Sequence, residues 1–190
     1  MTASSTFQTE RLILRPLCLD DFELLASLNR DPRVMEHFPA LLGAAETQRQ
    51  LGRLLSHREA HGFGTWVATL GATGESLGVF GLQHVDFQAA FTPAVEVFWR
   101  MVPASWGRGY ATEAARSLVR FGFQQLELAR IVGFTAARNG RSLALFGRIG
   151  MKPDARFDFD HPKLPLGHPL RRHLFFEARR SESGNRLLNT

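Results

Sequence analysis

The residues best suited to chemistry lie in one glycine-rich turn. The chain reads Trp-Gly-Arg-Gly-Tyr-Ala-Thr-Glu-Ala from residue 106 to residue 114. Two glycines separated by one residue, followed by small residues that open a helix, let the backbone approach a ligand closely and aim unpaired N–H groups at it. The helix dipole and the charge of Arg108 add attraction for an anion. The turn therefore predicts a phosphate or pyrophosphate cradle, although Gly-x-Gly alone is also typical of a plain tight turn.

The elements around this turn predict a mixed α/β fold. Residue patterns favour strands at 11–15, 65–70, 76–82, 93–102, 130–135, 157–159 and 172–177, and helices from Asp20 to before Pro32, from Ala44 to about His61, from about Thr112 to Leu126, and at 139–149. The strands before the turn form an antiparallel meander. The strand at 130–135 follows a helix and could lie parallel to the strand before the turn, which gives one βαβ unit in the sheet.

Bulk composition favours one domain with an anionic partner. A chain of 190 residues, 44% of them apolar, can bury one sizeable core. We expect a domain over 9–180, with a flexible lead at 1–8 and a flexible tail at 181–190. The net charge of +5 favours a polyphosphate, an acidic substrate or RNA. A single cysteine, Cys18, and the lack of an apolar run near the roughly 20 residues that span a bilayer indicate a cytoplasmic protein without membrane contact.

Three motifs in order resemble the GNAT superfamily of acyl-CoA N-acyltransferases. The family signature, Gln or Arg, two residues, Gly, one residue, Gly or Ala, maps onto Trp106, Gly109 and Ala111, with Trp106 in place of the usual Gln or Arg. The opening run at 9–16, Thr-Glu-Arg-Leu-Ile-Leu-Arg-Pro, is similar to the ribosomal-protein N-terminal alanine acetyltransferase branch. The same branch has an Asn-x-x-Ser pattern like Asn139 and Ser142. The resemblance spans roughly residues 9–180.

The resemblance implies a mostly antiparallel sheet, flanked by helices, that is split centrally for acetyl-CoA as co-substrate. The strands at 94–102 and 130–136 would part and admit the pantetheine arm. Main-chain N–H groups of the turn would hold the pyrophosphate, Met101 and Val102 would pair with the pantetheine amides, and Asn139 would offer its amide to the same arm. The implied cofactor-binding residues are Met101, Val102, Trp106, Gly107, Arg108, Gly109, Tyr110, Ala111, Thr112, Asn139 and Ser142.

Acyl transfer to an amine needs a base for the amine and a donor for the oxyanion. An α-amine has a pKa near 7.7–8.0, so a modest base suffices, whereas a lysine near 10.4 needs more help. Glu96 is the candidate base because it lies on the strand beside the expected gap. The structural alternative is an ion pair of Glu96 with Arg100, which shares its face, or with another surface cation. The oxyanion donor would be the main-chain N–H of Met101 or Val102.

Ser142 is the candidate acid for the leaving thiolate. Many superfamily members have a tyrosine seven residues after the motif asparagine, and here that residue is Phe146, which cannot donate. Ser142 lies one turn after Asn139; a helix-capping role for its hydroxyl is the alternative, and a good leaving group can also depart without an acid. Tyr110, the only tyrosine, is expected to pack against the turn.

The remaining aromatic and histidine residues favour structural roles. Trp66, Phe80 and Trp99 are typical of a core, with a substrate-facing role open for one of them. The loop from Phe159 to Leu170 is either a specificity element or a plain surface connection. The histidines show no evident pair at metal-ligand spacing on a helix face, so the sequence predicts no metal site. The histidines considered are His57, His61, His84, His161, His168 and His173.

The sequence thus predicts an N-acetyltransferase that moves an acetyl group from acetyl-CoA to a primary amine by direct attack in a ternary complex. The acceptor is a protein N-terminus or a small amine, and the chain is a monomer or a homodimer. Nothing near Cys18 resembles an activated thiol, which argues against an acyl-enzyme. A non-enzymatic basic module that binds RNA or a nucleotide phosphate is the alternative, but the chain lacks Gly-Lys-Ser/Thr and shows no long basic tract.

Overall fold

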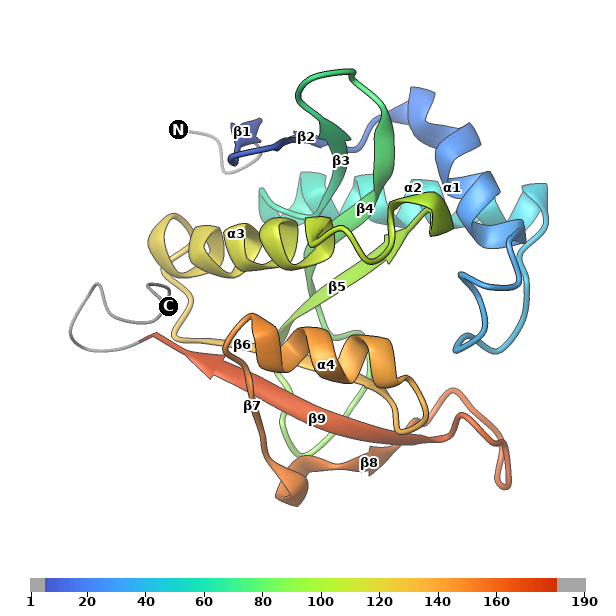
Figure 1. The fold of residues 1–190 in the computed structure, drawn as a ribbon. Helices are drawn as coiled ribbons and strands as arrows, with labels where there is room; N and C mark the ends of the chain where they lie inside the picture. Colours follow the sequence, from blue (N-terminus) through green and yellow to red (C-terminus); the bar gives the residue numbers. More distant parts are fainter. Residues whose placement is uncertain (1–5, 181–190) are drawn as a thin grey trace.

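The computed structural model describes residues 6–180 and shows one continuous sheet (Figure 1). The strand order is β1-β2-β3-β4-β5-β6-β9-β7, and β8 pairs with β9 off this path. Every pairing is antiparallel except the parallel pairing of β5 with β6. The strands are β1 (Phe7–Gln8), β2 (Leu12–Pro16), β3 (Thr65–Leu70), β4 (Ser76–His84), β5 (Val95–Met101), β6 (Arg130–Ala136), β7 (Lys152–Pro153), β8 (Phe159–Asp160) and β9 (Arg172–Arg179).

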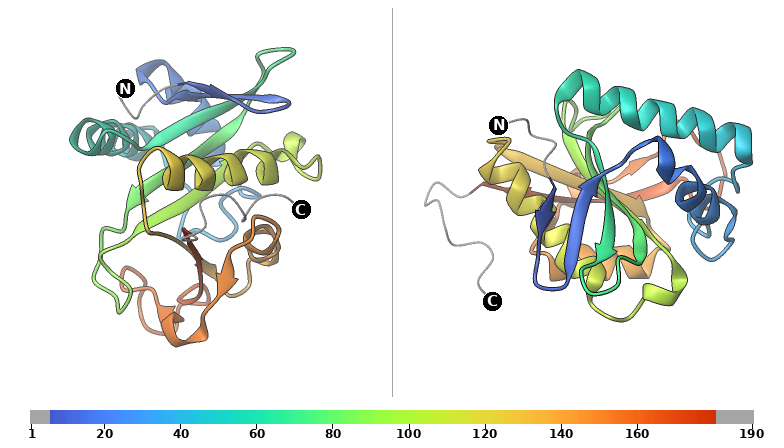
Figure 2. Two further views of the ribbon diagram at one scale, coloured as in Figure 1. Left: turned by 90° about the vertical axis from the view of Figure 1, so that its left-hand side faces the viewer. Right: turned by 90° about the horizontal axis from the view of Figure 1, so that it is seen from above.

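Helices cover both faces of this sheet (Figure 2). One face packs on α1 (Phe22–Arg30) and α2 (Ala44–His61), where Leu28 and Leu51 meet Val67 and Val79. The other face packs on α3 (Tyr110–Gln124) and α4 (Gly140–Arg148). Successive strand residues point to opposite faces, so β3 and β4 are buried on both sides, as their continuous apolar runs require. Short 3-10 turns lie at η1 (Leu19–Asp21), η2 (Pro103–Ser105) and η3 (Ala155–Phe157).

The sheet opens between its two parallel strands. β5 and β6 pair in register at one position only, Glu96 opposite Val132. β5 nevertheless stays paired with β4 as far as Met101 opposite Gly78, and β6 stays paired with β9 as far as Ala136. Each strand therefore keeps one edge paired with its outer neighbour, while beyond Glu96 the edges of β5 and β6 that face each other are unpaired. The expected mixed sheet, split at its centre, is confirmed.

The sequence misplaced only short elements. Two-residue strands such as β1 and β7 are too short for a period-two pattern, and neither was expected. β1 corrects the expected flexible lead at residues 7 and 8, because Phe7 pairs with Leu14 and stacks on Phe121 at a centroid distance of 5.5 Å. Residues 1–5 and the expected tail at 181–190 lie outside the described part of the chain. Within the described part, no helix is both long and apolar enough to cross a membrane.

Candidate active site

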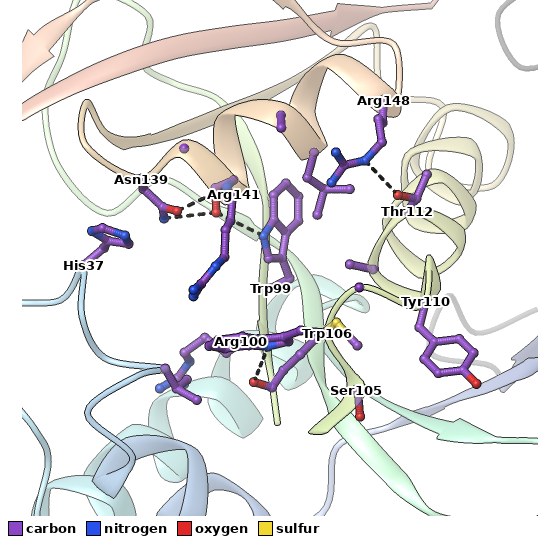
Figure 3. A pocket seen from close by; sticks show the side chains of 18 of the residues that line it. His37, Trp99, Arg100, Ser105, Trp106, Tyr110, Thr112, Asn139, Arg141 and Arg148 are labelled. Carbon is purple, nitrogen blue, oxygen red and sulfur yellow. Dashed lines mark hydrogen bonds between the residues drawn. The ribbon is translucent and has the colours of Figure 1, made fainter. Parts of the chain in front are cut away.

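A cleft of about 770 Å³ lies where β5, the turn before α3 and the start of α4 converge (Figure 3). Residues from the segment before α2 close its far side. Its size is typical of a small-molecule site. From the expected cofactor-binding residues the structure brings nine to this cleft and leaves Val102 and Arg108 outside its lining. The nine are Met101, Trp106, Gly107, Gly109, Tyr110, Ala111, Thr112, Asn139 and Ser142.

The turn before α3 presents unpaired N–H groups to the cleft. Gly107 and Gly109 have φ values of +75° and +79°, in the left-handed region that side chains other than glycine avoid. The first intrahelical bond runs from the N–H of Glu113 to the carbonyl of Gly109 at 3.1 Å. The N–H groups at positions 110–112 therefore have no intrahelical partner and carry the positive end of the helix dipole. Such a turn can bind a diphosphate.

The opening motif of the chain holds this turn in place. Glu113 accepts hydrogen bonds from the Thr9 hydroxyl at 2.5 Å and from the Arg11 N–H at 2.8 Å, and forms an ion pair with the Arg11 guanidinium at 2.7 Å. Burial opposes ionisation, but the bonds from Thr9 and Arg11 outweigh it and lower the pKa of Glu113. Arg11 also donates to the carbonyl of Arg108 at 3.1 Å and lies 4.7 Å above the ring of Tyr110. Tyr110 thus packs against the turn, as expected.

The edge of β5 offers Met101 to the cleft but not Val102. The N–H of Val102 donates to the carbonyl of Leu77 at 2.9 Å. Main-chain groups of an antiparallel strand alternate in direction, so Met101 points its N–H away from β4 and toward the cleft. The expectation that Val102 could supply the oxyanion donor is therefore wrong. The carbonyl of Met101 accepts a hydrogen bond from the Trp106 indole at 3.1 Å.

Asn139 lies at the start of α4 (Figure 3) and forms a hydrogen-bond network with Ser142. Asn139 caps the helix, accepting from the N–H of Ser142 at 3.1 Å. Its amide donates to Thr135 at 2.9 Å and to the Ser142 hydroxyl oxygen at 3.1 Å, and the expected contact of this amide with the pantetheine arm stays a prediction. The Trp99 indole donates to the same oxygen at 3.3 Å. With two donors on its oxygen, Ser142 keeps its own proton to donate.

Glu96 lies where β5 and β6 stop pairing. It is half-buried, and Gln83 donates a hydrogen bond to its carboxylate at 2.6 Å. Burial raises the pKa of Glu96 to about 7, although the Gln83 bond acts in the opposite direction. The expected alternative, an ion pair with Arg100, is wrong, because the Arg100 guanidinium donates to Asn29 instead. Glu96 does not itself line the cleft.

The sequence reading missed several cationic residues of the cleft. Arg141 lies 4.4 Å above the Trp106 ring, and Arg148 donates to the Thr112 hydroxyl at 3.3 Å. These two arginines are seven residues apart on α4, and that spacing, which places them on one helix face, is a signal that could have found them. No local pattern marks Arg33 and His37, which reach the cleft from the segment between α1 and α2.

The histidines correct one expectation. His57 and His61 are four residues apart on α2 and do share a helix face. His84, at the end of β4, joins them, and one possible ligand atom from each residue lies within 4.8 Å of the others. The expectation that no histidine pair has metal-ligand spacing is wrong.

The family follows from comparison with known proteins. The model of an acetyltransferase (GNAT) domain matches residues 11–152. The chain belongs to the GNAT acetyltransferase family. It is 34% identical over 156 residues to FsC-acetyl coenzyme A-N(2)-transacetylase of Aspergillus fumigatus, a match that covers 78% of this chain and 66% of that protein. The GNAT chain is accordingly an acetyl-CoA-dependent N-acetyltransferase.

Solved structures agree with this assignment. An acetyltransferase from Agrobacterium tumefaciens superposes with a TM-score of 0.76 at 30% identity, over 93% of this chain and 95% of that one. A ribosomal-protein-S5-alanine acetyltransferase from Vibrio fischeri shares the fold, with a TM-score of 0.71 at 14% identity over 94% and 98% of the two chains. The resemblance read from the motifs is confirmed, and a non-enzymatic RNA or nucleotide module is not favoured.

Proposed function

We propose that this GNAT enzyme transfers the acetyl group of acetyl-CoA to a primary amine by direct attack within a ternary complex. The observation that carries the proposal is the shared cleft. The unpaired N–H groups at the start of α3 and the open edge of β5 face the same space, so one extended molecule can contact both. No cysteine lies among the cleft-lining residues, which supports direct attack over an acyl-enzyme.

Acetyl-CoA fits the donor side of the cleft. The N–H groups at 107–112 would hold its diphosphate, and Arg141 and Arg148 add positive charge beside them. The Met101 edge would pair with an amide of the pantetheine arm. When bound, acetyl-CoA supplies an activated acyl group as a thioester.

Three groups of the chain would act on the reacting atoms. Glu96, with a pKa of about 7, would take a proton from the amine through ordered water, since its carboxylate does not reach the cleft. The Met101 N–H would donate to the developing oxyanion. Ser142 would donate a hydrogen bond to the leaving sulfur through its hydroxyl hydrogen, the one hydrogen-bonding capacity that its described partners leave unused. If the sulfur takes that proton, the serine oxygen would regain one from the nitrogen that becomes the amide.

The acceptor side favours an amine that carries a negative group. Among the described residues that line the cleft none is acidic, while Arg33, His37 and Arg100 are all basic. Arg33 forms an ion pair with Asp31 at 2.6 Å, so this preference depends on His37 and Arg100. Arg100 is buried, with Asn29 and Met35 as its described polar partners, and burial lowers the pKa of this guanidinium to about 10. His37 Nδ1 is buried without a described partner. A carboxylate near the acceptor amine would satisfy both groups, as buried polar groups require.

A panel of acceptors tests this preference. We would measure thiol release from acetyl-CoA with glutamate, with glutamine 1-amide as its counterpart without a carboxylate, with spermidine, and with peptides that have acidic or basic residues next to a free N-terminus. Acceptors with a carboxylate should show the highest kcat/KM. The ratio of their kcat/KM to that of acceptors without a carboxylate should be smaller in His37→Ala. Preference for spermidine would contradict the assignment.

A thermal-shift comparison tests the cofactor independently. Acetyl-CoA should raise the Tm, whereas ATP, NAD and an RNA oligomer should not. A response to RNA or ATP without one to acetyl-CoA would overturn the proposed function.

The proposed location is the cytoplasm, in keeping with the single free cysteine, and the proposed oligomeric state is a monomer or a homodimer.

A further inference from the structure

Three histidines converge at the junction of α2 and β4. His57 and His61 lie one turn apart at the C-terminal end of α2, and His84 is the last residue of β4. Their ring centroids are 4.6 Å apart for His57 and His61, 4.3 Å for His61 and His84, and 5.6 Å for His57 and His84. A candidate ligand nitrogen of each ring lies within 4.8 Å of the other two.

These separations are close to what a bound cation needs. With Zn–N bonds of about 2.0–2.1 Å at tetrahedral angles, two ligand nitrogens lie about 3.4 Å apart, so ring rotations that bring the nitrogens closer by at most roughly 1.4 Å complete the site. His61 and His84 are exposed and free to make such rotations, whereas His57 is half-buried. The half-buried ring of His57 would bind the ion first, and the exposed rings of His61 and His84 would rotate toward it.

The hydrogen bonds of the His57 ring determine which of its nitrogens can bind an ion. Its Nδ1 lies 3.1 Å from the carbonyl of Phe63, which fixes that nitrogen as the one that carries the proton. Its Nε2 then has a lone pair that accepts a hydrogen bond from the main-chain N–H of His84 at 3.0 Å. An ion that takes this lone pair would release the His84 N–H to solvent, at an exposed position.

The cluster lies against an aromatic ring and apart from the acetyl-transfer cleft. The ring of Phe63 packs on His57 and His84 at 5.4 Å from each and shields this side of the cluster. None of the three histidines lines the acetyl-transfer cleft.

We propose that His57, His61 and His84 form a binding site for one divalent first-row transition-metal ion, with Zn²⁺ as the reference ligand. Imidazole suits Zn²⁺, Ni²⁺, Cu²⁺ and Co²⁺, whereas Mg²⁺ and Ca²⁺ prefer oxygen. Three protein ligands leave the fourth position of a tetrahedral ion to water. The ion would join the end of α2 to the end of β4 and so stabilise the folded chain.

Titration of tag-free protein with ZnCl₂ tests the site, because a polyhistidine tag would bind the same ion. Calorimetry should show one Zn²⁺ per chain, Zn²⁺ should raise the Tm, and Co²⁺ in its place should give the visible absorption of a four-coordinate ion. His61→Gln and His84→Gln should each weaken Zn²⁺ binding at least about tenfold, since each removes one of three ligands. His168→Gln, which removes a histidine outside the cluster, should bind like the unchanged protein.

Two results would overturn the proposal. One is the absence of stoichiometric Zn²⁺ binding by the unchanged protein. The other is equal Zn²⁺ affinity in the unchanged protein and in the His61→Gln/His84→Gln double variant. Both substitutions are at exposed positions. Circular dichroism of the double variant would check that the Zn²⁺ affinities of two folded proteins are compared.

Discussion

The indole nitrogen of Trp99 lies 3.3 Å from the hydroxyl oxygen of Ser142, and this contact joins β5 to α4 across the cleft. The amide of Asn139 donates to the same oxygen from 3.1 Å. Because an indole N–H and an amide N–H can only donate, the Ser142 proton takes no part in either bond. The Ser142 hydroxyl therefore keeps a proton that neither of these two partners uses, which supports the proposed donor role.

Ser142→Ala should lower kcat by about tenfold, less than the usual contribution of a general acid, because a thiolate leaves readily. Steady-state kinetics at saturating acetyl-CoA measures this. Ser142→Thr keeps a hydroxyl and should retain most of the activity. If the alanine variant loses Tm but not kcat, the hydroxyl is structural, and the role assigned here is contradicted.

Glu96→Gln should lower kcat most at pH values just above 7, where the carboxylate is ionised but an α-amine still carries its proton. Raising the pH deprotonates the amine without help, so activity of the variant should recover toward that of the unchanged enzyme. The pH profile of kcat measures both effects. Overlapping profiles for the two proteins would mean that Glu96 is not the base.

Glu96→Gln should also raise the free energy of unfolding, although it lowers kcat. The folded pKa of Glu96, about 7, lies above the ordinary value of 4.5, so the carboxyl contributes stability that is present below about pH 4.5 and lost as the pH rises through 7. Glu96→Gln, which can still accept from Gln83, should therefore raise the free energy of unfolding above pH 7, by at most roughly 3 kcal/mol. Urea unfolding at pH 5 and pH 8 checks this; an equal effect at both pH values would contradict it.

Gly109→Ala should weaken acetyl-CoA binding by about tenfold. A side chain at φ +79° is strained by roughly 1–2 kcal/mol, and relief of that strain turns the N–H groups of the first helical turn away from the cleft. Gly52→Ala is the matched control, because Gly52 lies within α2 with open space around it and should tolerate a methyl group. Calorimetric titration with acetyl-CoA compares them, and equal affinities would count against the cradle.

Arg148→Gln should raise the dissociation constant of acetyl-CoA several-fold at low ionic strength and less at high ionic strength, because its guanidinium lies beside the proposed phosphate site. Arg120→Gln, on the exposed face of α3, makes the same charge change away from the cleft. Titrations at two salt concentrations measure the effect. A loss of affinity that is the same in both variants would show only the influence of net charge.

The sequence could predict the long elements and the cofactor turn because their signals are local. The bounds of α2 and β3 follow from apolar periodicity and from Gly62 and Gly71, and the two left-handed glycines follow from the Gly-x-Gly spacing. The oxyanion donor could not be predicted from a local signal, because the direction of each N–H on β5 depends on the register of β5 with β4. That register, and not residue type, excludes Val102 and favours Met101.

Contacts between distant segments could not be predicted from local pattern. Arg100 was expected beside Glu96 because the two share a strand face, but α1 brings Asn29 to it from 71 positions away. The histidine cluster shows both cases. The spacing of His57 and His61 is a local signal that the sequence carries, whereas the approach of His84 depends on how β4 ends against α2.

A crystal structure of the protein with acetyl-CoA tests the central claim most directly. We predict the diphosphate within hydrogen-bonding distance of the N–H groups at 107–112, the pantetheine arm along the open edge of β5, and the acetyl group beside Met101 and Ser142. Acetyl-CoA bound elsewhere, or lying in the cleft with its diphosphate away from the start of α3, would contradict the account.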